Sequence, residues 1–111
     1  MAWGTARSLA ACELECLLEH DPAAAGTLAE TLRVELPLGL HCISYPPQAW
    51  WAVARALRHR DPAAAEACRL EAQRWIDNAV MPDDDPATRE TFRHGNLVNR
   101  AVLAGWDAVA A

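Results

Sequence analysis

The sequence predicts an all-α protein: a compact bundle of five or six short helices built around a central αα-hairpin. Three observations predict this fold. Apolar residues recur at the i, i+3, i+4, i+7 spacing of amphipathic helices. Asp-Pro pairs repeatedly supply an N-cap followed by a proline at the first helical position. The chain is also rich in alanine, the strongest helix former. Its 111 residues fit a single helical domain, residues 1–111.

The central hairpin is predicted over residues 46–76. Pro46 and Pro47 can open its first helix, because the missing N–H of proline costs nothing in a first turn. The apolar stripe of that helix comprises Trp50, Val53, Ala54 and Leu57. Asp61-Pro62 begins the second helix, whose buried face comprises Ala65, Cys68, Ala72, Trp75 and Ile76. Two apolar stripes joined by a tight turn are typical of an αα-hairpin.

The opposite face of the second hairpin helix is predicted to face water. It carries Glu66, Arg69, Gln73 and Asp77. Glu66 with Arg69, and Glu71 with Arg74, stand at i, i+3 and are expected to form ion pairs. Each such pair stabilises a helix by about 0.2–0.5 kcal/mol.

Two helices are predicted before the hairpin. The first begins at Ser8 as N-cap and ends near His20, with Ala10, Leu14, Leu17 and Leu18 on its apolar stripe. Asp21-Pro22 begins the second, whose stripe comprises Ala25, Leu28, Ala29 and Leu32. Pro37 and Gly39 should end it near Leu36. The apolar residues that follow, up to Tyr45, are expected to form an ordered loop beneath the hairpin.

The residues after the hairpin predict a loop and two more helices. The acidic run 83–85 marks the loop, and Asp85-Pro86 begins the next helix. Gly95 suits the residue after that helix, and Asn96 suits the N-cap of the last one. The last helix carries Val98, Ala101, Val102, Trp106 and Val109 on one face. The sequence DPA begins at Asp21, Asp61 and Asp85, and we interpret it as repeated capping rather than as a solenoid repeat.

The charge of the chain is acidic and unevenly distributed. A net charge of −5 argues against a nucleic-acid binder and suits either solubility or contact with a basic protein partner. Residues 1–45 carry six acidic residues against two arginines, whereas residues 46–80 carry five arginines against four acidic residues. This pattern fits either a docking surface or two solvated faces.

Neither a membrane span nor a secretory signal is expected. No run of about 18 apolar residues is present, so membrane insertion is not predicted. The N-terminal segment lacks a basic region followed by a long apolar one, so it is a poor signal peptide. The expected location is therefore cytoplasmic, where the four cysteines stay reduced.

The sequence carries no catalytic signature. It has no P-loop, GxGxxG, GxSxG or HExxH motif, and the acidic run 83–85 lacks the spacing of an EF-hand. We therefore expect a protein that is not an enzyme and that needs no cofactor.

Four residues offer an alternative based on thiol or zinc chemistry. Cys12 and Cys16 share a helix face, and His41 and Cys42 are adjacent in the apolar loop, so together they could form a Cys₃His zinc site. Helical i, i+4 cysteines do not form the usual zinc knuckle, however, and free cysteines are among the most buried residues. Core cysteines without a metal are therefore the favoured interpretation, for Cys68 as well.

Several residues are candidates for contact with a protein partner. Trp51 lies about 100° around the helix from Trp50, on the side of Arg55 and Arg58, so a single stripe is not expected to bury both tryptophans fully. Tryptophan and arginine are enriched in binding hot spots. The alternative is that Trp51 packs under the loop or another helix. The candidate contact residues are Trp51, Arg55, Arg58 and Trp3, with the acidic Glu13, Glu15 and Glu19 of the first helix.

Parts of the chain resemble a known protein family. PPQAWWAVARALR, EACRLEAQRWI, DDPATRE and AVLAGWDAVAA resemble an uncharacterised bacterial all-helical family associated with type VI secretion gene clusters. The likeness covers residues 37–111 and is carried by Trp50, Trp51, Trp75, Pro86 and Arg89. The resemblance implies an accessory or adaptor role in a bacterial multiprotein system, with no catalytic residues.

The resulting hypothesis is a non-enzymatic protein–protein interaction module, an adaptor of a secretion-type system. One alternative is a small acidic immunity- or antitoxin-like inhibitor of a basic toxin. The other is the thiol- or zinc-dependent protein described above.

Overall fold

The computed structural model describes residues 3–39, 45–79 and 84–108, and the side chains of residues 12–37, 45–79 and 84–107. Within these ranges all regular structure is helical, which confirms the all-α prediction. The α-helices are α1 (Trp3–His20), α2 (Pro22–Gly39), α3 (Pro46–Leu57), α4 (Pro62–Ala79), α5 (Pro86–Glu90) and α6 (Leu97–Ala104). A π-helical turn, η2 (Thr91–Gly95), follows α5, and a 3₁₀ turn, η3 (Gly105–Ala108), follows α6.

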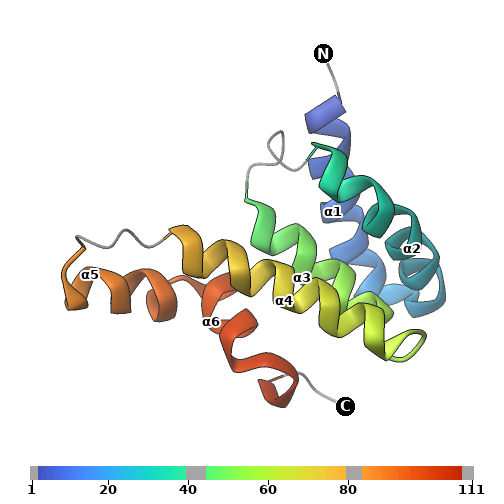
Figure 1. Cartoon of the computed structure of the whole chain (residues 1–111). Coiled ribbons are helices and arrows are strands. Elements are labelled where there is room, and N and C mark those ends of the chain that lie inside the picture. Colours follow the sequence, from blue (N-terminus) through green and yellow to red (C-terminus); the bar gives the residue numbers. More distant parts are fainter. Residues whose placement is uncertain (1–2, 40–44, 80–83, 109–111) are drawn as a thin grey trace.

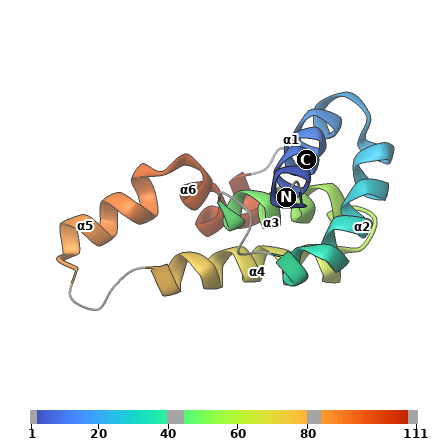
Figure 2. The same cartoon turned by 90° about the horizontal axis from the view of Figure 1, so that it is seen from above.

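Helix α3 lies at the centre of the molecule (Figure 1). It packs along α4 as the predicted hairpin, against the α1–α2 pair on one side and against α6 on another. Helix α5 lies beyond the far end of α4, away from α1 and α2, in both views (Figures 1 and 2). The molecule is flattened, with extents of 42 × 39 × 22 Å.

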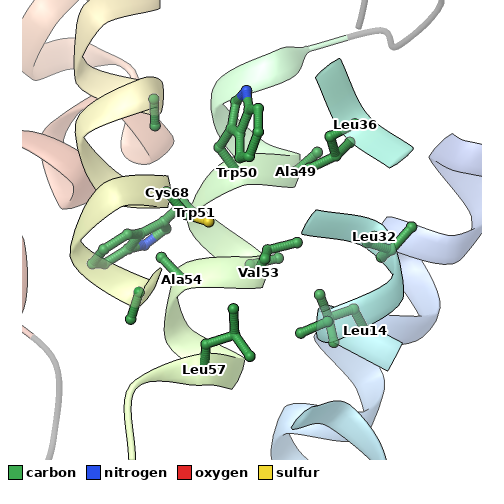
Figure 3. Packing of buried hydrophobic residues seen from close by; sticks show 14 of the residues in the cluster. Leu14, Leu32, Leu36, Ala49, Trp50, Trp51, Val53, Ala54, Leu57 and Cys68 are labelled. Atoms are coloured by element: carbon green, nitrogen blue, oxygen red, sulfur yellow. The ribbon is translucent and has the colours of Figure 1, made fainter. Parts of the chain in front are cut away.

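The core surrounds α3 on almost every side. The predicted stripe of Trp50, Val53, Ala54 and Leu57 is buried, and so are Ala49, Trp51 and Ala52 on its other faces. Leu14, Leu32 and Leu36 face α3 from the α1–α2 pair, and Cys68 faces it from α4 (Figure 3). A helix packed from several directions buries more than one stripe, which the amphipathic pattern alone does not indicate.

The predicted helix caps are present. The side chains of Asp21, Asp61 and Asp85 accept hydrogen bonds from the backbone N–H three residues on, at 3.2, 3.1 and 2.7 Å. Asn96 does the same for α6, accepting from the backbone N–H of Asn99 at 3.0 Å. Each cap satisfies an N–H that the helix itself leaves unpaired.

Several predicted boundaries are wrong. Helix α1 begins at Trp3, so Ser8 lies inside it and is not the N-cap. Helix α2 continues through Pro37 to Gly39, although Pro37 has no N–H to donate to the carbonyl four residues before it. The buried Leu36 anchors this last turn in the core. The last helix ends at Ala104, where Gly105 adopts a φ of 70° and turns the chain.

The predicted water-facing side of α4 is partly covered, contrary to expectation. The Arg69 side chain is only 14% exposed, since α6 and η3 pack over it. It pairs with Glu66 at 2.7 Å and donates to the Val102 carbonyl at 3.2 Å. Trp106 Nε1 donates to the same Glu66 carboxylate at 2.9 Å. The predicted Glu66–Arg69 pair is thus confirmed, and it also holds the C-terminal segment.

Some predictions concern parts of the chain outside the described residues. These are the apolar loop between α2 and α3, with His41 and Cys42, most of the acidic loop before Asp85, and the side chains of Trp3, Ser8 and Ala10.

Candidate functional site

A groove of about 590 Å³ lies where the end of α1, the start of α2 and the end of α3 meet. We call it the α1–α3 groove. Its apolar lining comprises Leu18, Pro22, Ala23, Gly26 and Ala56. Its charged and polar lining comprises Glu15, Glu19, Arg55, Arg58, His59 and Arg60. The acids come from α1, whereas the basic residues come from α3 and the α3–α4 turn. The groove therefore has an apolar base, an acidic side and a basic side.

Arg55 connects α3 with α1 at the acidic side. Its Nη2 donates to Glu15 Oε1, and its guanidinium lies 5.8 Å from the centre of the Trp51 ring. Both side chains are only about a quarter to a third exposed, so water screens this pair less than a surface pair. The negative charge of Glu15 is thus paired with Arg55 within the protein.

Arg58 lies over the ring of Trp106, 5.5 Å from its centre. Trp106 in turn contacts Trp51, with ring centres 5.1 Å apart and planes tilted by 37°. Trp51 is only 5% exposed beneath this cover. The expectation that Trp51 is an exposed anchor is therefore wrong, and the alternative that it packs under another element holds. The covering element is the turn η3, and sequence periodicity did not predict that η3 packs over Trp51.

Arg60 lies across the first turns of α2. It pairs with Glu30 at 3.3 Å and donates to the Ala23 carbonyl at 3.3 Å and to Thr27 Oγ1 at 3.5 Å. Its guanidinium covers Gly26, where an added Cβ would stand 2.9 Å from Arg60 Cζ. Glycine costs a helix interior about 1 kcal/mol relative to alanine. The room that Arg60 needs explains a glycine at this position.

The groove brings together four of the seven predicted contact residues: Glu15, Glu19, Arg55 and Arg58. Glu13 is exposed but lies about 200° around α1 from Glu15, so it does not line the groove. The Trp3 side chain lies outside the described residues. Sequence reasoning missed His59, Arg60 and the apolar base. The lone glycine in an alanine-rich helix was the available signal for Arg60.

The cysteines only partly follow the core interpretation. Cys68 is buried as predicted, and this burial raises the pKa of its thiol to about 11, which keeps it protonated and unreactive. Cys12 and Cys16 are exposed, so the interpretation of them as core residues is wrong. They lie on the side of α1 that its neighbours leave uncovered. Among the described side chains, no group of three or more His, Cys, Asp or Glu is placed to hold a metal ion.

None of the helices in the described ranges is long and apolar enough to span a bilayer. No family model, curated protein or solved structure matches the chain.

Proposed function

We propose that the protein is a non-enzymatic, cytoplasmic protein-binding module whose α1–α3 groove receives a segment of a partner protein. The observation that carries this proposal is the groove itself, which gathers residues chosen independently as contact candidates. Its volume of about 590 Å³ lies within the 300–1,000 Å³ range of pockets that bury a ligand. That space accommodates a few side chains of a peptide segment.

The groove is held in shape before any partner arrives. Arg55 is fixed by Glu15, Arg58 lies on Trp106, and Arg60 is held on α2. Ordering a long side chain on binding costs about 0.5–1.5 kcal/mol, so arginines already in place reduce the cost of association. Arginine is also a residue type enriched in binding hot spots.

The resemblance to the family associated with type VI secretion supports an adaptor role in a bacterial secretion-type system. The alternative, an acidic inhibitor of a basic toxin, would rely on the acids of α1. The pairing of Glu15 with Arg55 removes one of these acids from the available surface and favours the groove.

Site-specific photo-crosslinking in the native host tests this proposal. A photoreactive residue replaces His59, which is exposed at the groove, and in a control strain it replaces Arg74, which is exposed toward the far end of α4. We expect a discrete adduct from position 59 and none from position 74. Adducts from both positions, or from position 74 alone, would overturn the groove as the contact site.

The identity of the captured protein separates the two roles. Components of one secretion machine, recovered together, support the adaptor. A single basic toxin that dissociates slowly supports the inhibitor.

A further inference from the structure

We infer that the α1–α3 groove is selective for a peptide segment in which an aliphatic side chain adjoins a carboxylate, with the carboxylate at the α3–α4 turn. This inference rests on the proposed function and adds the chemistry of the occupant. It follows from how charge and apolar surface are distributed within the groove.

The basic side of the groove is concentrated in one turn. Arg58, His59 and Arg60 are consecutive, and the backbone reverses direction there through hydrogen bonds from Arg60 and Asp61 to the Leu57 carbonyl, at 3.1 and 2.8 Å. All three residues line the groove. The first residues of α2 also line the groove, and Arg60 lies against them through its hydrogen bond to the Ala23 carbonyl.

The charges already present direct a carboxylate to this turn. On the opposite wall, Glu15 is neutralised by Arg55, and the exposed Glu19 repels an anion. At the turn, Arg60 is paired with Glu30, whose side chain is 57% exposed. Exposed ion pairs contribute little, so a carboxylate bound in the less hydrated groove can share or replace this partner.

The base of the groove supplies the second part of the selectivity. Leu18 on α1 and Ala56 on α3 are only partly covered by the protein, and both line the groove beside its charged residues. Burying an aliphatic side chain against them removes apolar surface from water. The groove thus offers one site for an aliphatic side chain beside one site for a carboxylate.

A titration of the ¹⁵N-labelled protein with two matched synthetic peptides tests the inference. The probes are acetyl-Asp-Leu-Glu-amide and its uncharged counterpart acetyl-Asn-Leu-Gln-amide. We expect the acidic peptide to shift the amide signals of Ala23, Gly26, Ala56 and His59, and to bind at least fivefold more tightly than the uncharged one. Raising the salt concentration should reduce this preference. Arg58→Gln should reduce it at least threefold, whereas Arg74→Gln should leave it unchanged.

Each other outcome contradicts a defined part of the account. Equal binding of both peptides at the groove overturns carboxylate selectivity and leaves the proposed function standing. Shifts confined to other surfaces, or no shifts, overturn the inference. If the inference fails but the photoreactive residue at position 59 forms its adduct in the host, the proposed function stands. If position 59 forms no adduct, the inference and the proposed function both fail.

Discussion

Asn99 is the only fully buried polar side chain among the described residues. Its Oδ1 accepts a hydrogen bond from the Tyr45 hydroxyl, and its Nδ2 donates to the Phe92 carbonyl at 2.9 Å. The Tyr45 ring also contacts the ring of Trp75 edge-on, with centres 5.2 Å apart. The side chain of Asn99, which belongs to α6, thus links this helix to η2 and to the residue before α3.

We predict that Asn99→Ala lowers the free energy of unfolding by about 2–3 kcal/mol, because it leaves the Tyr45 hydroxyl and the Phe92 carbonyl without this partner and opens a cavity. Asn78→Ala is the matched control, since Asn78 is exposed on α4 and the change should be neutral or slightly stabilising. Urea denaturation measures both. Equal effects would contradict the account of Asn99.

Gly26→Ala is predicted to weaken partner binding without lowering the stability of the fold. The added methyl group displaces the guanidinium of Arg60, which is the flexible end of a side chain. The helix gains about 1 kcal/mol from alanine, and the loss of an exposed ion pair costs about 0–1 kcal/mol. Thermal unfolding should therefore show equal or slightly higher stability, while partner binding at the groove weakens at least fivefold.

Arg60→Ala is the comparison for this variant. It should weaken binding to a similar extent without the gain in helix stability. If Gly26→Ala binds the partner as well as the wild type does, Arg60 has no role in the groove.

At the scale of elements, α5 is the least supported helix. None of its residues is buried, and it packs mainly against η2, which follows it. Helices with few buried contacts open locally at low free energy. Hydrogen exchange should therefore be roughly 100-fold faster for the amides of α5 than for those of α3 and α4. Equal protection of α5 and α4 would show that another surface stabilises α5.

The contact between α4 and η3 is predicted to depend on pH. The hydrogen bond from Arg69, aided by the one from Trp106, holds the pKa of Glu66 below its usual range. A lowered folded-state pKa means that the stabilisation is present above the unfolded value, about 4.3, and is lost as pH falls through the folded-state pKa. The effect is limited because the Glu66 side chain is 42% exposed.

Glu66→Gln checks this dependence. The wild type should be more stable than the variant at pH 7, and the difference should shrink as the pH falls below about 4. Urea denaturation at a series of pH values measures it. A constant difference would mean that the charge of Glu66 is not responsible.

At the scale of the whole molecule, the sequence alone predicted the features that depend on residues close together in the chain. The αα-hairpin follows from the spacing of Trp50, Val53 and Leu57, and the starts of α2, α4 and α5 follow from Asp-Pro capping. These features depend on residues only a few positions apart.

Contacts between distant segments could not be predicted in the same way. Trp106 covers Trp51 from 55 positions away, and Arg60, in the turn between α3 and α4, lies over Gly26 of α2. The residue types of the groove were identified in part, but their convergence depends on how α1 and α2 pack against α3. A single sequence carries no periodic signal for that packing.

A matched charge reversal shows whether the α1–α3 groove is the partner-binding surface. Calorimetry would compare the captured partner's affinity for the wild type, Arg58→Glu and Arg74→Glu, with the melting temperature of each variant confirming that it is folded. Both substitutions change the net charge equally, but only Arg58 lines the groove. We predict at least tenfold weaker binding, about 1.4 kcal/mol, for Arg58→Glu and less than a twofold change for Arg74→Glu. Equal effects, or a larger loss with Arg74→Glu, would show that the partner binds elsewhere.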